Sequence, residues 1–77
     1  SSAASASRLA EQNVLFAVAD PALLGMLQEI TAPWGLRPTP VSTAAAALEA
    51  LRSQALDVVL VDADLDGAET ILAAAPG

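Results

Sequence analysis

The sequence predicts an α/β fold in which three parallel strands form an open sheet with helices on its faces. Two short apolar runs, Val14–Val18 and Val58–Val61, are typical of buried strands, and a weaker extended segment lies between them. A segment with helical spacing of apolar residues follows each of the first two of these three segments. Parallel strands joined through helices form right-handed crossovers, which favours the strand order 2-1-3 with the first strand in the centre. The length of 77 residues allows one small domain.

The first strand and helix are predicted from Val14 to about Ala32. The run Val14–Val18 is continuously apolar, as expected for a strand that is buried on both faces of a parallel sheet. Asp20 is placed to cap a helix whose first residue is Pro21, and we expect that helix to end near Ala32. Its apolar stripe is expected to face the sheet and to place the tryptophan in the core or at the core edge; it comprises Leu23, Leu24, Leu27, Ile30 and Trp34.

The second strand and helix are predicted from Leu36 to Ser53. Leu36–Val41 contains Pro38 and Pro40, which a strand tolerates only at the edge of a sheet. Ser42 and Thr43 then cap a helix over Ala44–Ser53. The residues of this helix that we expect to face inward are Ala44, Ala47, Leu48 and Leu51.

The third strand is the clearest, because four apolar residues stand between two carboxylates in Asp57–Asp62. A polar loop over Ala63–Gly67 leads to a short helical segment over Glu69–Ala75. We interpret residues 1–12, which are rich in Ser and Ala, as a linker or leader, and residues 13–77 as the folded domain.

Composition excludes several functions. The chain has no His and no Cys, so zinc, haem and thiol sites and His-activated nucleophiles cannot be built. Its net charge is −6 with three basic residues, which predicts that it does not bind nucleic acid. The apolar runs are too short for a membrane span and no secretory signal is recognisable, so we expect a cytoplasmic protein.

The carboxylates that follow the first and third strands are the candidate functional residues. They are Asp20 after the first strand and Asp62, Asp64 and Asp66 after the third. In an open α/β sheet, function gathers at the carboxyl ends of the strands, where clustered carboxylates can recruit Mg²⁺. The alternative is structural: Asp20 caps a helix, which we favour for that residue alone, while Asp64 and Asp66 form turns.

Three segments together resemble the first half of a response-regulator receiver domain, which has a flavodoxin-like fold. They are Asn-Val-Leu-Phe-Ala-Val-Ala-Asp-Pro over residues 13–21, Val-Ser-Thr-Ala-Ala-Ala-Ala-Leu-Glu-Ala-Leu-Arg over 41–52, and Asp-Val-Val-Leu-Val-Asp over 57–62. In that family, the Asp that ends the third strand accepts a phosphoryl group from a histidine kinase, and an acidic pair after the first strand holds Mg²⁺. The resemblance therefore makes Asp62 the candidate phosphoacceptor.

The chain departs from the family pattern where Mg²⁺ would bind. Val18 and Ala19 stand at the positions of the acidic pair, and the chain contains no Lys, whereas the family uses one in a later strand. We therefore expect a non-catalytic, receiver-like module of a bacterial two-component protein, such as a hybrid histidine kinase, with phosphorylation impaired or absent. Its partners would be neighbouring signalling domains or a histidine kinase. The alternative is a working receiver that uses Asp62.

A second motif overlaps the same loop. Asp62-Ala-Asp-Leu-Asp-Gly67 matches the first half of an EF-hand calcium loop, but the twelfth position, which should be a bidentate Glu, is Ala73. A weak Ca²⁺ or Mg²⁺ loop on a small α/β scaffold is therefore a third hypothesis. The uncovered edge of the third strand also predicts self-association or marginal folding of the isolated chain.

Overall fold

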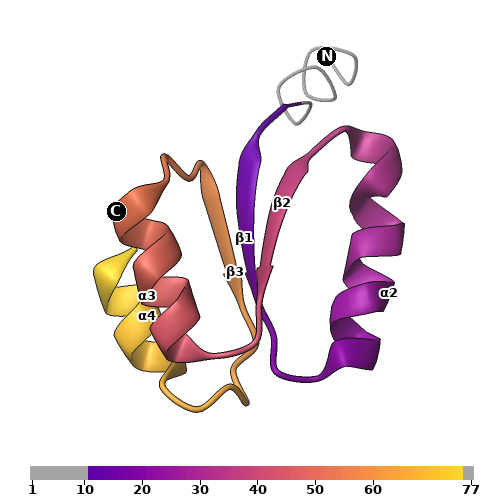
Figure 1. The fold of residues 1–77 in the computed structure, drawn as a ribbon. Helices are drawn as coiled ribbons and strands as arrows, with labels where there is room; N and C mark the ends of the chain where they lie inside the picture. Colours follow the sequence, from indigo (N-terminus) through magenta and orange to yellow (C-terminus); the bar gives the residue numbers. More distant parts are fainter. Residues whose placement is uncertain (1–10, 76–77) are drawn as a thin grey trace.

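The computed structural model describes residues 11–75 and confirms the predicted α/β class (Figure 1). Three parallel strands form an open sheet in the order β2-β1-β3. The strands are β1 (Asn13–Ala17), β2 (Arg37–Val41) and β3 (Val58–Val61), and the helices are α2 (Pro21–Thr31), α3 (Ala44–Ser53) and α4 (Ala68–Ala74), with the 3₁₀ turn η1 (Ala32–Trp34) after α2. The leader expected over residues 1–12 lies mostly outside the described part of the chain.

The sheet separates α2 from α3 and α4, which lie together on the opposite face (Figure 1). The central strand β1 is buried on both faces, because Val14–Val18 is almost inaccessible to solvent. Leu15 and Ala17 belong to the cluster that contacts α3 and α4. Since side chains alternate along a strand, Phe16 and its neighbours of the same parity face α2.

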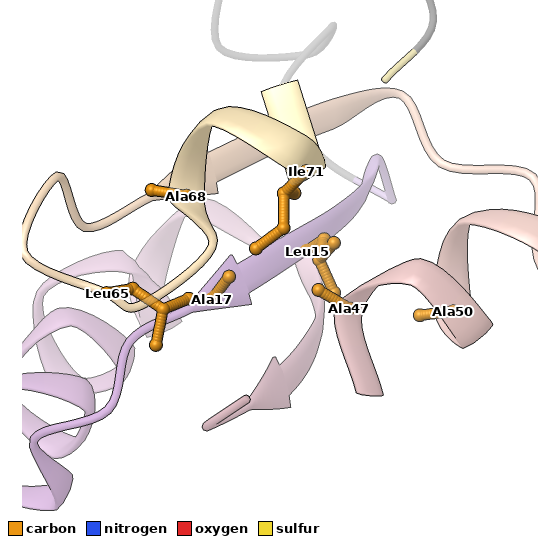
Figure 2. Close-up of a cluster of buried hydrophobic side chains, with 7 residues drawn as sticks. All are labelled: Leu15, Ala17, Ala47, Ala50, Leu65, Ala68 and Ile71. Carbon is orange, nitrogen blue, oxygen red and sulfur yellow. The ribbon is translucent and has the colours of Figure 1, made fainter. Parts of the chain in front are cut away.

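The core between the sheet and the α3–α4 pair is built mainly from small residues (Figure 2). Leu15 and Ile71 are its two largest side chains that are wholly buried. The remaining members of the cluster are Ala17, Ala47, Ala50, Leu65 and Ala68. Four alanines allow the helices to approach the sheet closely, but each adds little apolar area. The stability of this core therefore depends on a few large side chains.

Capping residues begin two of the helices as predicted. The carboxylate of Asp20 accepts a hydrogen bond from the backbone N–H of Ala22 at 2.9 Å, and Pro21 is the first residue of α2. The hydroxyl of Thr43 accepts one from the backbone N–H of Ala46 at 3.2 Å and caps α3. Helix α4 begins instead after Gly67, which has a positive φ of 86° and offers no side-chain cap.

The prediction for the inner face of α2 is wrong at its C-terminal end. Ile30 is 54% exposed and Trp34 is 48% exposed, whereas Thr31 is buried. Thr31 donates its hydroxyl hydrogen to the carbonyl of Leu27 at 2.8 Å, one turn earlier on the same face. The sheet-facing side is therefore rotated towards Thr31, and the 3₁₀ turn that follows leaves Trp34 at the surface.

Helix α3 also differs in detail from the predicted inner face. Ala47 and Ala50 are buried, and Ala44 and Leu51 pack against the core cluster as expected. Leu48 is only half-buried and lines a surface groove. The inner face of the helix is thus rotated from Leu48 towards Ala50 relative to the predicted stripe. Within residues 11–75, no helix has the length and apolar character required to cross a bilayer.

Candidate functional site

Strand register places Asp62 directly beside the end of β1. Ala17 and Val61 form the last pair of the two strands, so Val18 and Asp62 are the residues that directly follow this pair. The backbone N–H of Asp62 donates to the carbonyl of Ala17 at 3.0 Å, which fixes this position. The chain after β1 and the chain after β3 therefore meet at the carboxyl end of the sheet, where open α/β sheets place their functional residues.

The residue beside Asp62 is apolar and inaccessible. Val18 is 1% exposed, and its backbone N–H donates to the carbonyl of Val41 at 3.0 Å, which extends the contact of β1 with β2. Ala19 is exposed and carries no functional group, and Asp20 is exposed beyond it. The first strand thus contributes no carboxylate next to Asp62.

Asp20 uses one carboxylate oxygen to begin α2. Its Oδ1 atom accepts the hydrogen bond from Ala22, and its backbone has the extended conformation of an N-cap residue. This interaction agrees with the structural interpretation of Asp20 that we favoured from the sequence. A metal ion at this position would compete with the helix cap for the same carboxylate.

Asp62 organises the loop that follows β3. Its Oδ1 atom accepts a hydrogen bond from the backbone N–H of Asp64 at 3.0 Å, and its carbonyl accepts one from Leu65 at 2.9 Å. The first contact is the side-chain turn that Asp commonly makes with the residue two positions later. Leu65 is thereby turned into the core cluster, while Asp64 and Asp66 remain exposed.

The four predicted carboxylates are not assembled into one ligand set. Among the described residues, no group of three or more acidic side chains is arranged to hold a metal ion. Val18 and Ala19, which precede Asp20, supply no side-chain oxygen. Binding of Mg²⁺ or Ca²⁺ by this loop stays a prediction to be measured.

The loop also differs in its setting from an EF-hand. The residues before Asp62 form the strand β3, whereas an EF-hand loop follows a helix. Ala73, at the twelfth loop position, lies within α4 and is exposed. Gly67 does have the positive φ that a tight turn requires at this point, but it serves to begin α4.

Two surface hollows lie away from these carboxylates. The larger has a volume of about 540 Å³ and is lined by Ala45, Leu48, Leu51, Arg52 and Ala74. The other, of about 320 Å³, is lined by Leu51, Gln54, Ala55, Leu56 and Ala74. The second set includes the chain between α3 and the start of β3, so it lies towards the amino ends of the strands. Ligand sites of open α/β sheets lie at the opposite ends.

The surface of β3 was only partly anticipated from the sequence. Its open edge was predicted, but the exposure of two of its four side chains was not: Val58 is 43% exposed and Leu60 is 38% exposed. From the sequence, Asp57 was only the carboxylate before this strand. In the structure its Oδ2 atom accepts a hydrogen bond from the backbone N–H of Asn13 at 2.8 Å. It therefore anchors β3 to the start of β1.

Fold and site together define a small open-sheet α/β protein with one strand-terminal aspartate. Comparison of the sequence with protein-family models and curated proteins, and of the structure with solved structures, finds no significant match. The function must therefore be argued from the residues themselves.

Proposed function

We propose that the chain is a non-catalytic, receiver-like regulatory module of a bacterial two-component signalling protein in the cytoplasm, such as a hybrid histidine kinase. Its role is to dock against neighbouring domains or a histidine kinase, and phosphorylation of Asp62 is impaired or absent. The strand order β2-β1-β3 and the place of Asp62 at the end of β3 are compatible with a receiver-like arrangement.

The observation that carries the proposal is the place of Asp62, which follows the last strand pair, Ala17 with Val61, as Val18 does on the other chain segment. Phosphoryl transfer to a carboxylate brings several negative oxygens together, and a bound divalent cation offsets that charge. The neighbour of Asp62 across the sheet is a buried valine, and the one carboxylate that follows it, Asp20, caps a helix. A docking role does not need this metal.

The test is exposure of the protein to Mg²⁺ and acetyl phosphate, followed by intact-mass measurement. We expect no gain of a phosphoryl group in the native chain. A gain that disappears in Asp62→Asn would overturn the proposal and establish a working phosphoacceptor. The Asn side chain can still accept the hydrogen bond from Asp64, so the loop is preserved in this control.

A gain-of-function variant makes the test sharper. Ala19 is exposed, so Ala19→Asp adds a carboxylate next to Asp20 without burying a charge, whereas Val18→Asp would bury one. We expect Ala19→Asp to strengthen Mg²⁺ binding relative to the native chain, measured from amide shifts in a Mg²⁺ titration. Ala19→Asn is the matched control. Equal responses of Ala19→Asp and the native chain would contradict the view that a missing carboxylate limits the site.

A further inference from the structure

The loop after β3 contains a reactive dipeptide that the proposed function does not use. Asp66 is followed by Gly67, and it is the one aspartate of the chain whose next residue is glycine. The backbone nitrogen of the residue after an aspartate can attack the side-chain carboxyl carbon and close a five-membered succinimide ring. A glycine leaves this nitrogen unshielded, because it has no Cβ and adopts many backbone conformations.

The structure fixes this dipeptide in a type II β-turn. The backbone N–H of Ala68 donates to the carbonyl of Leu65 at 3.0 Å, so Asp66 and Gly67 are the two central residues. Gly67 has φ 86° and ψ 14°, as the second central residue has in types II and I′. Type I′ also requires a positive φ at the first central residue. Within residues 11–75, Glu11 is the one non-glycine residue with positive φ, so the turn is type II.

A type II turn holds Asp66 away from the geometry of ring closure. Its first central residue has a ψ of about +120°. Ring closure requires the Cβ of Asp66 and the nitrogen of Gly67 to be eclipsed about the Cα–C bond of Asp66. An L residue carries its Cβ about 120° from its own nitrogen around that bond, so the eclipsed arrangement occurs at a ψ of about −120°. The folded turn therefore keeps the nitrogen out of reach of the carboxyl carbon.

Rotation of Asp66 into the reactive conformation disturbs the core. It breaks the hydrogen bond between Ala68 and Leu65, and both of these residues are buried members of the core cluster at 6% exposure each (Figure 2). Gly67 directly precedes the first turn of α4. Ring closure is therefore coupled to the release of Leu65 and of the start of α4 from the core, which is a local opening of the fold.

We propose that Asp66 is a modification site, which forms a succinimide and then isoaspartate when this loop opens and which the folded turn protects. In the first step the nitrogen of Gly67 bonds to Cγ of Asp66, and the N–H hydrogen and the carboxyl hydroxyl leave as one water molecule. In the second step water adds to the former main-chain carbonyl carbon of Asp66, and the bond from this carbon to the ring nitrogen breaks. The main chain then runs through the side chain, the former main-chain carbonyl becomes a free carboxylate, and the mass returns to that of the original chain.

Isoaspartate does not fit the native turn. It inserts one methylene group into the main chain between Leu65 and Gly67. Leu65 is held in the core on one side of the insertion, and on the other side a single carbon added to Gly67 would lie 2.9 Å from the Cβ of Ala44. Modification thus converts a transient opening of the loop into a lasting one. This inference goes beyond the proposed docking role and does not depend on it.

The test is incubation of the protein at neutral pH and physiological temperature, in buffer and in guanidinium chloride that unfolds it, followed by digestion. Isoaspartate is located by chromatography with mass spectrometry and by labelling with a protein isoaspartyl methyltransferase, which methylates the new carboxylate. In guanidinium chloride, Asp66 should isomerise faster than Asp64, which precedes a leucine. In buffer, the rate at Asp66 should be lower by about tenfold or more, because only the opened fraction reacts. Equal rates at the two aspartates in guanidinium chloride, or equal rates at Asp66 in the two solvents, would overturn the proposal.

Variants separate ring closure from opening of the loop. Asp66→Glu keeps the charge but requires a six-membered ring, which closes less readily, so the isomer should disappear from this position in both solvents. Ile71→Ala removes a wholly buried side chain of α4 and leaves the dipeptide unchanged, so it should raise the rate at Asp66 in buffer but not in guanidinium chloride. Leu72→Ala is the matched control at an exposed position of the same helix and should leave both rates unchanged. A rate in buffer that is the same in Ile71→Ala as in the native chain would overturn the coupling to the core.

Discussion

Gly67 joins the loop after β3 to helix α4 and is the residue whose replacement the structure predicts most sharply. It has φ 86° and ψ 14°, in the left-handed region, and it is the residue that precedes the first turn of α4. A Cβ atom built on it would lie 2.9 Å from the Cβ of Ala44, at the start of α3. The perturbation is Gly67→Ala, which adds that one carbon.

Two costs combine in this variant. A non-glycine residue in the left-handed region loses about 1–2 kcal/mol. The contact with Ala44 is shorter than real Cβ atoms show, so either α3 or the loop must shift, and overpacking of this kind costs about 1–3 kcal/mol. We therefore expect a loss of about 2–5 kcal/mol. The free energy of unfolding of a small domain is only about 0.1 kcal/mol for each residue, so a loss of this size is a large fraction of the total.

Urea unfolding followed by circular dichroism measures this loss. With an m value of about 1 kcal/mol/M, the midpoint should fall by roughly 2 M or more, or the variant should be unfolded in water. Gly25→Ala is the matched control, because Gly25 lies inside α2 and a Cβ added to it meets no atom within 4 Å. That substitution should raise stability by about 0.5–1 kcal/mol.

The reasoning is refuted if Gly67→Ala unfolds at the same urea concentration as the native chain or at a higher one. The double variant Ala44→Gly with Gly67→Ala separates the two costs. Removing the Cβ of Ala44 relieves the contact but not the backbone strain, so the two substitutions should show a favourable coupling of about 1 kcal/mol or more. Strict additivity would show that the contact between the Cβ atoms of residues 44 and 67 costs no stability.

Three further predictions concern the core, the α2 cap and the acidic loop. Ile71→Ala should destabilise the protein by about 2–5 kcal/mol because this side chain is wholly buried. Leu72→Ala should change stability by less than about 1 kcal/mol, because Leu72 is 59% exposed. Equal effects of the two substitutions would contradict the assigned inner face of α4. Asp20→Ala should lower the free energy of unfolding by about 1 kcal/mol because the cap of α2 is lost, and Asp20→Asn should lower it much less. Urea midpoints in the opposite order would exclude a capping role for Asp20. Addition of millimolar Ca²⁺ should produce no saturable amide shifts around Asp64, and saturation that Asp64→Asn abolishes would favour the calcium-loop hypothesis instead.

Local signals in the sequence were sufficient for most of the secondary structure. A continuous apolar run predicted the buried strand β1, and paired prolines predicted that β2 lies at an edge. Asp20 before Pro21 and Thr43 before the alanine run predicted where α2 and α3 begin. Each of these features depends on residues close in sequence, which is why the chain alone could indicate them.

The burial of individual helix residues could not be predicted in the same way. The spacing of Leu27, Ile30 and Trp34 suggested one inner stripe, yet the stripe turns towards Thr31. How far a helix rotates about its axis depends on the surface it meets, and on the α2 face of the sheet both strands that flank β1 keep exposed residues, Pro38 and Pro40 on β2 and Val58 and Leu60 on β3. For a similar reason, Ala50 of α3 is buried although it was not predicted to face inward, whereas Leu48, which was, lines a surface groove.

By itself, the sequence determined the α/β class, the strand order and the position of Asp62 at the end of a strand, because alternation, capping and crossover handedness are local or topological rules. Only the tertiary structure decided which residue lies beside Asp62. Strand register brings Val18, 44 positions earlier in the chain, to its side, and the same register leaves Val58 and Leu60 exposed beside an unpaired edge. Contacts across such separations depend on how whole elements pack, which no local pattern records.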